Sequence, residues 1–255
     1  MDTEQVNSRA WDKEEERGNW WTRIIGKDEI EKAKRGDIAL RITTEKAVPS
    51  SWTERMKNKD VLVLCGGGGQ QTPLLAAYGC RVTSVDISQR QIEQDRKALE
   101  MYGLSARTVV GSALSLPFES SSFDAVVNPI SINFIEDINR VYDEVDRVLR
   151  SGGYFMMGIA NPVLYIFDEK KQRRKLRVKY TLPFSTTKSL SEKEVERKIE
   201  KGDTLEFSHT LENIITPLLR KGFVMEDFFT DSTLSEPTDS FIHDSFLAFL
   251  FRKTR

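Results

Sequence analysis

The chain is predicted to fold as a doubly wound α/β protein, a mostly parallel sheet with helices on both faces. Strand-like and helix-like segments alternate from Val61 to Ala160, which is typical of parallel strands joined by helical crossovers. Four consecutive glycines, 66–69, separate the first strand from the first crossover helix, and Asp86 ends the second strand. Glycines at such a turn and an acidic residue at that strand end predict a nucleotide-type cofactor site.

The elements follow in the order that such a sheet requires. Ser88 and Gln91 have the spacing of a capping box at the start of the second crossover helix. Apolar residues at 138, 141, 142, 145, 148 and 149 recur at helical spacing and predict one buried stripe. Ser151-Gly152-Gly153 is expected to end that helix. The expected strands are 61–65, 81–85, 108–110, 123–128, 154–160, 223–229 and 246–251; the expected helices after residue 60 are 70–78, 88–101, 138–149, 190–201 and 211–220.

The chain is expected to form one compact domain of four consecutive parts. Residues 1–55 would form an N-terminal helical cap, 56–162 the cofactor-binding core, 163–205 a cap insertion, and 206–255 the end of the core. The insertion carries a basic run from Lys170 to Lys179. That run is interpreted as a solvated helix face balanced by the acidic residues at 192–203, and the alternative is attraction of an anionic substrate.

Composition limits the classes of partner. The 255 residues carry 38 Lys and Arg against 39 Asp and Glu, so no net field attracts nucleic acid or a membrane surface. We expect no secretory signal, no membrane span and no metal site. Two cysteines, Cys65 and Cys80, make no disulfide framework and favour a reducing cytoplasm. A small molecule is the expected partner, and oligomeric state is left open.

The glycine run is compatible with two classes of cofactor. Read from Gly66 or from Gly67, the dinucleotide pattern G-x-G-x-x-G places Gln71 or Thr72 where its third glycine belongs. NAD is therefore disfavoured and remains an alternative. A tight turn without any ligand is a second alternative, which the backbone entropy lost by four glycines makes less favourable.

The segments VLVLCGGGG, SVDIS, GSALSLPFESSSFDAVV and EVDRVLRSGGYF occur in this order over about residues 60–160. This ordered set resembles the class I S-adenosylmethionine-dependent methyltransferases, and within them small-molecule enzymes such as the quinone-biosynthesis methyltransferases. The resemblance implies a Rossmann-like seven-stranded sheet whose last strand is antiparallel. It also implies S-adenosylmethionine bound at the carboxyl ends of the first four strands.

The resemblance assigns roles to particular residues. The glycine loop would line the methionine moiety, Asp86 would accept hydrogen bonds from the ribose, and Ile87 would pack on the adenine. The implied cofactor-binding residues are Cys65, Gly66, Gly67, Gln70, Asp86, Ile87, Gly111, Ser112, Ala113, Asn128 and Pro129.

The sequence departs from the family pattern at three places in these motifs. Val63 stands where a carboxylate is usual, and Cys65 replaces the first glycine of the loop. Ser112 takes the place of an acidic residue. Two simpler roles remain as alternatives, since Asp86 can serve as an exposed strand-end carboxylate and Asn128 can satisfy the backbone of a turn.

The acceptor side of the site is less determined by the sequence. Transfer of an activated methyl group needs mainly an acceptor held in line, and a base only when that acceptor is protonated. His209 is the candidate base, with a structural role beside a helix start as the alternative. Trp20, Trp21 and Tyr165 are candidates for an aromatic or apolar acceptor pocket. An NAD-linked oxidoreductase and a non-catalytic adenosylmethionine-binding protein are the alternative functions.

Overall fold

The computed structural model describes residues 1–168, 176–233 and 238–255. The basic run therefore lies largely outside the described residues. The strands are β1 (Asp60–Leu64), β2 (Arg81–Asp86), β3 (Arg107–Val110), β4 (Phe123–Asn128), β5 (Leu149–Ala160), β6 (Phe223–Asp231) and β7 (Phe246–Lys253). The helices are α1 (Thr3–Glu16), α2 (Lys27–Lys34), α3 (Ser50–Thr53), α4 (Gln71–Tyr78), α5 (Gln89–Tyr102), α6 (Ile138–Val148), α7 (Thr186–Ser189), α8 (Glu192–Lys201) and α9 (Leu211–Arg220). Short 3-10 turns are η1 (Trp20–Thr22), η2 (Glu54–Met56), η3 (Ile132–Phe134), η4 (Pro162–Ile166) and η6 (Thr238–Ser240).

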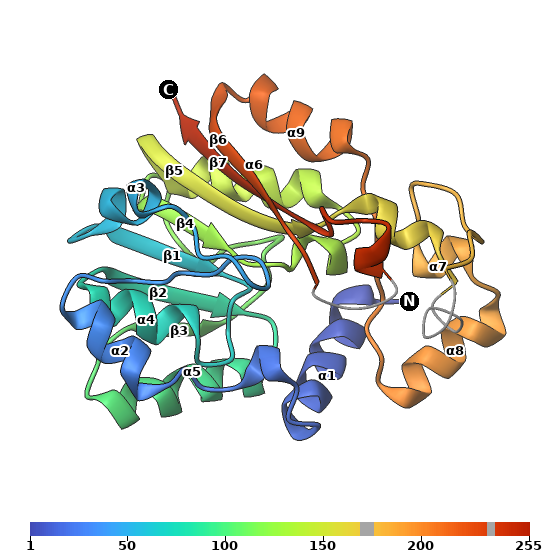
Figure 1. Ribbon diagram of the computed structural model, residues 1–255, viewed down its shortest axis with the longest axis horizontal. Helices are drawn as coiled ribbons and strands as arrows, with labels where there is room; N and C mark the ends of the chain where they lie inside the picture. Colours follow the sequence, from blue (N-terminus) through green and yellow to red (C-terminus); the bar gives the residue numbers. More distant parts are fainter. Residues whose placement is uncertain (169–175, 234–237) are drawn as a thin grey trace.

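The described strands form a seven-stranded sheet in the order β3-β2-β1-β4-β5-β7-β6 (Figure 1). The pairs among β1 to β5 are parallel, whereas β7 runs antiparallel to both β5 and β6. This confirms the expected mostly parallel sheet with its last strand antiparallel. The order reverses between β1 and β4, and in open α/β sheets ligands bind outside the carboxyl ends of the strands at that point.

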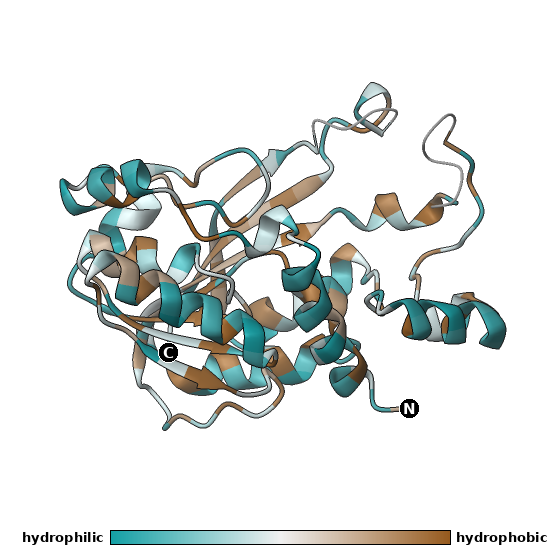
Figure 2. Cartoon of the chain, turned by 90° about the horizontal axis from the view of Figure 1, so that it is seen from below, coloured by the Kyte–Doolittle hydropathy of each residue, from teal (hydrophilic) through white to brown (hydrophobic). Residues whose placement is uncertain are grey.

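Side chains of successive strand residues enter two separate cores. Leu62 and Leu64 of β1 pack on one face with the buried stripe of α6 and with α9. Val61 and Val63 face the opposite way and pack with α2, Trp52 and α4. This period of two is what a sheet covered on both faces requires. Figure 2 shows the matching pattern in the helices, whose hydrophilic and hydrophobic residues lie on different sides.

Strand β5 begins earlier than predicted. It starts at Leu149, and Ser151-Gly152-Gly153 lie within it rather than ahead of it. The pairing with β4 shifts register between Phe123 and Ala125, and Gly152 has a positive φ of 77°. The two glycines therefore accommodate a bulge in the strand.

The N-terminal helix packs beside the segment before α9. Val195, Leu205 and Phe207 form a small buried cluster against which Val6 of α1 packs. Asn7 fixes this contact, because its amide donates to the Leu205 carbonyl at 2.9 Å and accepts from the Leu205 N–H at 2.7 Å. In Figure 1, α1 lies near the ends of β1–β3 to which the arrows point.

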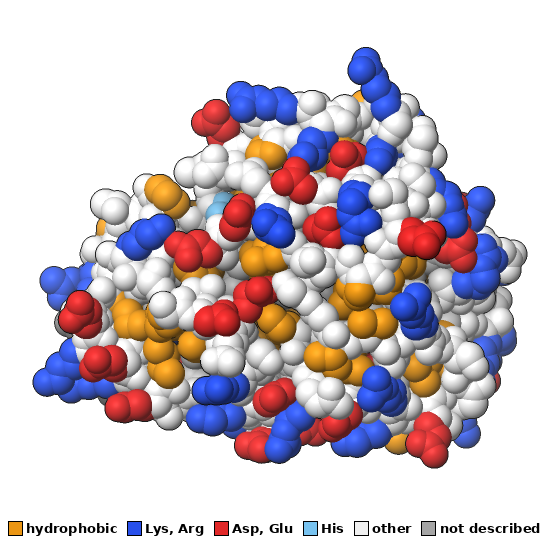
Figure 3. All heavy atoms as spheres, turned by 180° about the vertical axis from the view of Figure 1, so that it is seen from behind, with side chains coloured by type: hydrophobic (Ala, Val, Ile, Leu, Met, Phe, Trp, Pro, Cys, Tyr) orange, Lys and Arg blue, Asp and Glu red, His pale blue; other side chains and the backbone are white. Residues whose placement is uncertain are grey.

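Over the face seen in Figure 3, basic and acidic side chains are interspersed. This distribution agrees with the net charge of −1. Within the described ranges, no helix is both long enough and apolar enough to cross a lipid bilayer.

Candidate cofactor site

A cavity of about 270 Å³ lies where the strand order reverses. Its walls come from α1, the glycine loop, the end of β2, the loop after β3 and the segment after β4. Its lining is Glu4, Asn7, Trp11, Trp21, Cys65, Gly66, Gly67, Gln70, Gln71, Asp86, Ile87, Gln91, Ala113, Pro129, Ile130, Ser131, Asn133, Phe134, Ile135, Ala160 and Phe246. The structure thus brings together eight of the eleven cofactor residues expected from sequence: Cys65, Gly66, Gly67, Gln70, Asp86, Ile87, Ala113 and Pro129.

The glycine loop is required by contacts within the protein itself. A Cβ on Gly66 would lie 2.6 Å from Cγ1 of Val63, and one on Gly67 would lie 2.7 Å from Cβ of Gln91. Gly68 and Gly69 have positive φ angles of 115° and 81°. Cys65 also has a positive φ, 52°, which is unusual for a residue with a side chain. Close packing on β1 and α5, together with the positive φ angles, therefore explains the glycine run without reference to a ligand.

Asp86 at the end of β2 holds this loop in place. One carboxylate oxygen accepts from the N–H of Gly67 at 3.2 Å, and the other accepts from the N–H of Ser88 at 2.9 Å. The residue is 8% exposed, so it is not the exposed strand-end carboxylate of the alternative reading. Burial raises the pKa of Asp86 to about 6, although its backbone hydrogen bonds lower it.

A second buried carboxylate, Asp95 of α5, also supports the loop. It accepts from the N–H of Gly69 at 2.8 Å and from the hydroxyls of Thr72 and Ser84, each at 2.7 Å. Burial raises the pKa of Asp95 to about 7, against the lowering effect of these donors. Asp95 joins the loop, α4 and β2 at one point, and it was absent from the residues expected from sequence.

The start of α5 differs in part from the expected capping box. The Ser88 hydroxyl accepts from the N–H of Gln91 at 3.1 Å, as predicted. The Gln91 side chain does not return to the cap and donates instead to the carbonyl of Trp11 at 3.1 Å. Contact with α1 therefore takes the place of the second half of the box.

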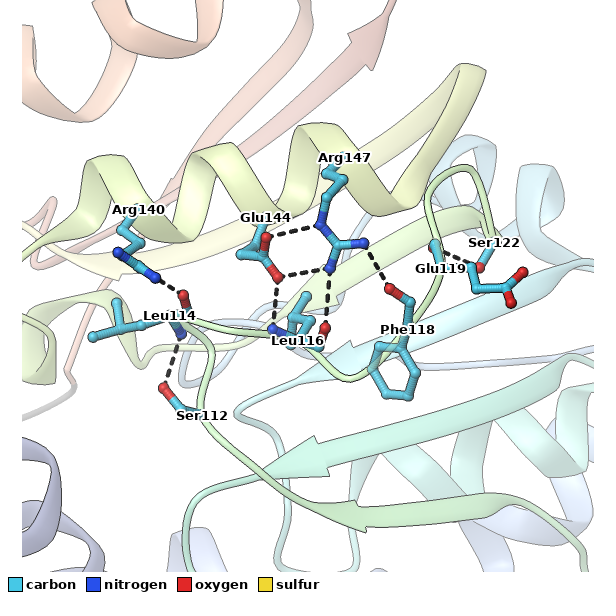
Figure 4. A network of polar contacts seen from close by, with 9 residues as sticks. All are labelled: Ser112, Leu114, Leu116, Phe118, Glu119, Ser122, Arg140, Glu144 and Arg147. Atoms are coloured by element: carbon cyan, nitrogen blue, oxygen red, sulfur yellow. Dashed lines mark hydrogen bonds and ion pairs between the residues drawn. The ribbon is translucent and has the colours of Figure 1, made fainter.

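The loop after β3 is fixed on α6 (Figure 4). Arg147 donates to the carbonyls of Phe118 and Leu116, and Arg140 donates to the carbonyl of Leu114. Glu144 accepts from the N–H of Leu116 at 2.6 Å. Gly111 and Ser112 are not among the lining residues, whereas the next residue, Ala113, is. Of the three residues expected from this loop, one lines the cavity. The motifs gave no sign of the anchors on α6.

Two buried amides lie at the end of β4 and in the segment that follows it. Asn128 is fully buried and outside the lining; its amide donates to the carbonyl of Leu64 at 2.7 Å and to the hydroxyl of Ser131 at 2.6 Å. Asn133 lines the cavity, and its Oδ1 is buried without a hydrogen-bond partner in the described part of the chain. Asn128 therefore ties the end of β4 to β1 and to Ser131, and its own Oδ1 also has no hydrogen-bond partner among the described residues. Asn133 was not among the residues expected from sequence.

The four acceptor-side candidates lie in different places. Trp21 lines the cavity. Trp20 stacks on the ring of Trp21, with the two ring centroids 3.8 Å apart, and is 46% exposed. Tyr165 lines a second cavity of about 210 Å³ that shares Ala160 and Phe246 with the first. His209 lines neither; its Nε2 lies 2.9 Å from the carbonyl oxygen of Ile135, and burial lowers its pKa. His209 as the base is therefore a prediction that this geometry does not support.

Adenosylmethionine carries a ribose diol, an ammonium group and an adenine amine, all of them hydrogen-bond donors. The cavity offers an acceptor for such groups in the buried carboxylate of Asp86. Ile87 and Ala113 supply apolar surface beside it. Fold and cavity together define the class of α/β proteins that hold a nucleoside-containing cofactor at the switch point of the sheet.

Comparison with known proteins identifies the family. Residues 62–157 match the family model described as a methyltransferase domain. The uncharacterized methyltransferase YbaJ of Bacillus subtilis is 41% identical over 227 residues, which cover 88% of this chain and 89% of that protein. The chain belongs to the class I S-adenosylmethionine-dependent methyltransferases. Its cofactor is S-adenosylmethionine, which decides against the NAD-linked alternative. Membership of a methyltransferase family decides against the non-catalytic one.

Two further matches show how far the likeness extends. The demethylmenaquinone methyltransferase of Clavibacter sepedonicus is 33% identical over 117 residues, covering 46% of this chain and 45% of that protein. An S-adenosylmethionine dependent methyltransferase from Listeria monocytogenes superposes with a TM-score of 0.61 at 16% identity, covering 79% of this chain and 92% of that one. The second match shows the fold alone.

Proposed function

We propose that the cavity around Asp86 binds S-adenosylmethionine through the residues expected from sequence. Asp86 accepts hydrogen bonds from the ribose, and Ile87 and Ala113 enclose the adenine. The backbone from Cys65 to Gly67, with Gln70 and Pro129, lines the methionine moiety. Three further expected residues lie behind this lining and fix the conformation of the loops: Gly111, Ser112 and Asn128. The observation that carries this assignment is the buried Asp86 carboxylate in the wall of the cavity.

The second cavity is the proposed site of a small aromatic or apolar acceptor. Phe184 lies in its wall, with ring centroids 5.7 Å from Tyr165 and 5.0 Å from Tyr180. Aromatic rings arranged in this way favour a flat or apolar ligand. Because Ala160 and Phe246 line both cavities, an acceptor held among the rings adjoins the cofactor cavity.

The proposed reaction is one in-line displacement. The bound cofactor supplies an activated methyl group, whose bond to sulfur breaks as the acceptor's lone pair bonds to its carbon, leaving adenosylhomocysteine. The protein orients the acceptor and excludes water with the apolar walls. No role as base is proposed for His209, so an acceptor that loses a proton releases it to solvent.

Two variants test the assignment of the cavities. Asp86→Ala should weaken binding of adenosylhomocysteine at least about tenfold, whereas Asp143→Ala on exposed α6 surface should not. Phe184→Ala should lower methyl transfer to aromatic acceptors in a screen with isotopically labelled cofactor, with cofactor affinity unchanged. Unchanged affinity in Asp86→Ala would contradict the cofactor site. Unchanged turnover in Phe184→Ala would contradict the acceptor pocket.

A reducing compartment, the cytoplasm, is the proposed location. Cys65 and Cys80 are free thiols. Burial raises the pKa of Cys80 to about 12, which disfavours its reactive thiolate. Fractionation of the source cells with antibody detection tests this, and recovery outside the cytoplasmic fraction would contradict it.

A further inference from the structure

The carboxylate that the family pattern has after Gly111 is replaced here by Ser112, but a carboxylate nevertheless lies at this point. The Ser112 hydroxyl donates to Oε1 of Glu4, a residue of the first turn of α1, 108 positions earlier in the chain. The same hydroxyl accepts from the N–H of Leu114 at 2.9 Å. Its single proton is thus directed at Glu4, and Glu4 is held at the loop after β3.

Glu4 faces the same cavity as the proposed adenine contacts. It lines that cavity together with Ile87 and Ala113, and it is partly buried. A carboxylate accepts hydrogen bonds and donates none when ionised. Adenine presents an exocyclic amino group, which donates, beside a ring nitrogen, which accepts. Ser112 has already committed its proton, so Glu4 is the acceptor on this side of the cavity.

The position of Glu4 is set by several contacts along α1. Ser8 donates to the carbonyl of Ile87 at 3.0 Å, and Asp12 accepts from the Ser88 hydroxyl at 2.6 Å. Both contacts fall on the two residues after Asp86, and Asn7 ties the helix to Leu205. Helix α1 is therefore aligned with the end of β2, and the loop that bears Ser112 is fixed on α6 (Figure 4).

We propose that Glu4 binds the exocyclic amino group of the cofactor's adenine, so that α1 supplies the base-recognising carboxylate that the loop after β3 lacks. This inference rests on the proposed function of the cavity. Selectivity then comes from charge and hydrogen bonding: an adenine amine is accepted, and a carbonyl oxygen at the same position is repelled by the carboxylate. The N-terminal helix is accordingly part of the cofactor site.

Calorimetric titration with two nucleosides that differ at this one position tests the proposal. The ligands are S-adenosylhomocysteine and its deaminated counterpart S-inosylhomocysteine, which has a carbonyl in place of the amine. The unmodified protein should prefer the adenosyl compound at least about tenfold. In Glu4→Gln this preference should fall to within about threefold, because an amide can serve either ligand. Glu16→Gln, the same change on the outer side of α1, should keep the full preference.

A second variant separates recognition from folding. Glu4→Ala combined with Ser112→Asp places a carboxylate directly on the loop and should recover the preference that Glu4→Ala loses. A merely structural role for Glu4 would lower affinity for both ligands equally and leave the preference unchanged, which would overturn the inference. If the unmodified protein binds neither nucleoside, the proposed function of the cavity fails and this inference fails with it.

Discussion

The N–H of Gly67 donates to the carboxylate of Asp86 at 3.2 Å and thereby joins the loop after β1 to the end of β2. The other oxygen of that carboxylate accepts from Ser88 at the start of α5. One buried group thus arranges two loops of the cavity. Because it does so by accepting hydrogen bonds, its ionised form matters both for the loop and for the proposed contact with ribose.

Cofactor affinity is predicted to fall in acid through Asp86. Its pKa of about 6 lies above the ordinary value of 3.8, and hydroxyl donors of a ribose favour the ionised form. The affinity for adenosylhomocysteine should therefore fall as the pH drops below about 6, up to about tenfold per pH unit. Titrations from pH 7.5 to 5 check this. An equal slope in Asp86→Asn would assign the effect to another group.

The raised pKa of Asp86 has the opposite effect on the stability of the protein without cofactor: it makes the fold less stable as the pH rises. The folded chain holds the Asp86 proton more tightly than the unfolded chain does. The contribution of this group to the free energy of unfolding is therefore fully present below about pH 4 and is lost as the pH rises through about 6. Urea denaturation of Asp86→Asn should lack this component, and an unchanged pH profile would contradict it.

At position 65, glycine is predicted to be more stabilising than alanine. The φ of 52° at Cys65 is unfavourable for any residue with a Cβ, by roughly 1 kcal/mol. Both substitutions remove the sulfur, and only Cys65→Gly removes the backbone strain. Cys65→Gly should therefore have the larger free energy of unfolding by about 1 kcal/mol. The reverse order would show that the positive φ carries no cost.

Asp95 is predicted to be a major support of the glycine loop. Asp95→Ala leaves the N–H of Gly69 and the hydroxyls of Thr72 and Ser84 without their acceptor, which should cost about 3 kcal/mol. Asp95→Asn should cost less, because the amide can accept from Gly69 and donate to a hydroxyl. Chemical denaturation compares the two. Equal loss in both variants would assign the role to charge rather than to hydrogen bonding.

Gly67→Ala is predicted to abolish cofactor binding. The new Cβ would lie 2.7 Å from Cβ and 3.1 Å from the backbone carbon of Gln91, so the loop must move away from α5. Gly103→Ala is the control: its φ of 62° is unfavourable for alanine, but a Cβ there meets no atom within 4 Å. It should cost about 1 kcal/mol of stability and leave affinity unchanged. Full affinity in Gly67→Ala would contradict the loop geometry.

Local sequence patterns predicted most of the fold. The stripe of α6 is buried as expected, and Gly103 ends α5 in the left-handed conformation. The start of β5 was wrong because Ser151-Gly152-Gly153 indicates a break in any local reading. These residues form a bulge only because β5 pairs with β4. Pairing between residues 26 or more positions apart leaves no signal in the local sequence.

The candidate site divides in the same way. Asp86 was found because it ends a strand after a glycine loop. Asp95 lies in the polar stretch of α5, where a carboxylate is expected to be exposed to solvent. Its burial depends on Ser84 and Thr72, which belong to other elements. Glu4 and Asn133 reach the cavity through the packing of α1 and the turn after β4. No spacing rule connects such distant positions.

Isothermal titration of the purified protein with S-adenosylmethionine, S-adenosylhomocysteine and NAD tests the central claim most directly. The cavity around Asp86 should bind both adenosyl compounds with dissociation constants on the order of 1–10 μM, about −7 to −8 kcal/mol. NAD should show no binding, and Asp86→Ala should lose the adenosyl signal. Absence of binding to either adenosyl compound, or equal binding by Asp86→Ala, would contradict the account.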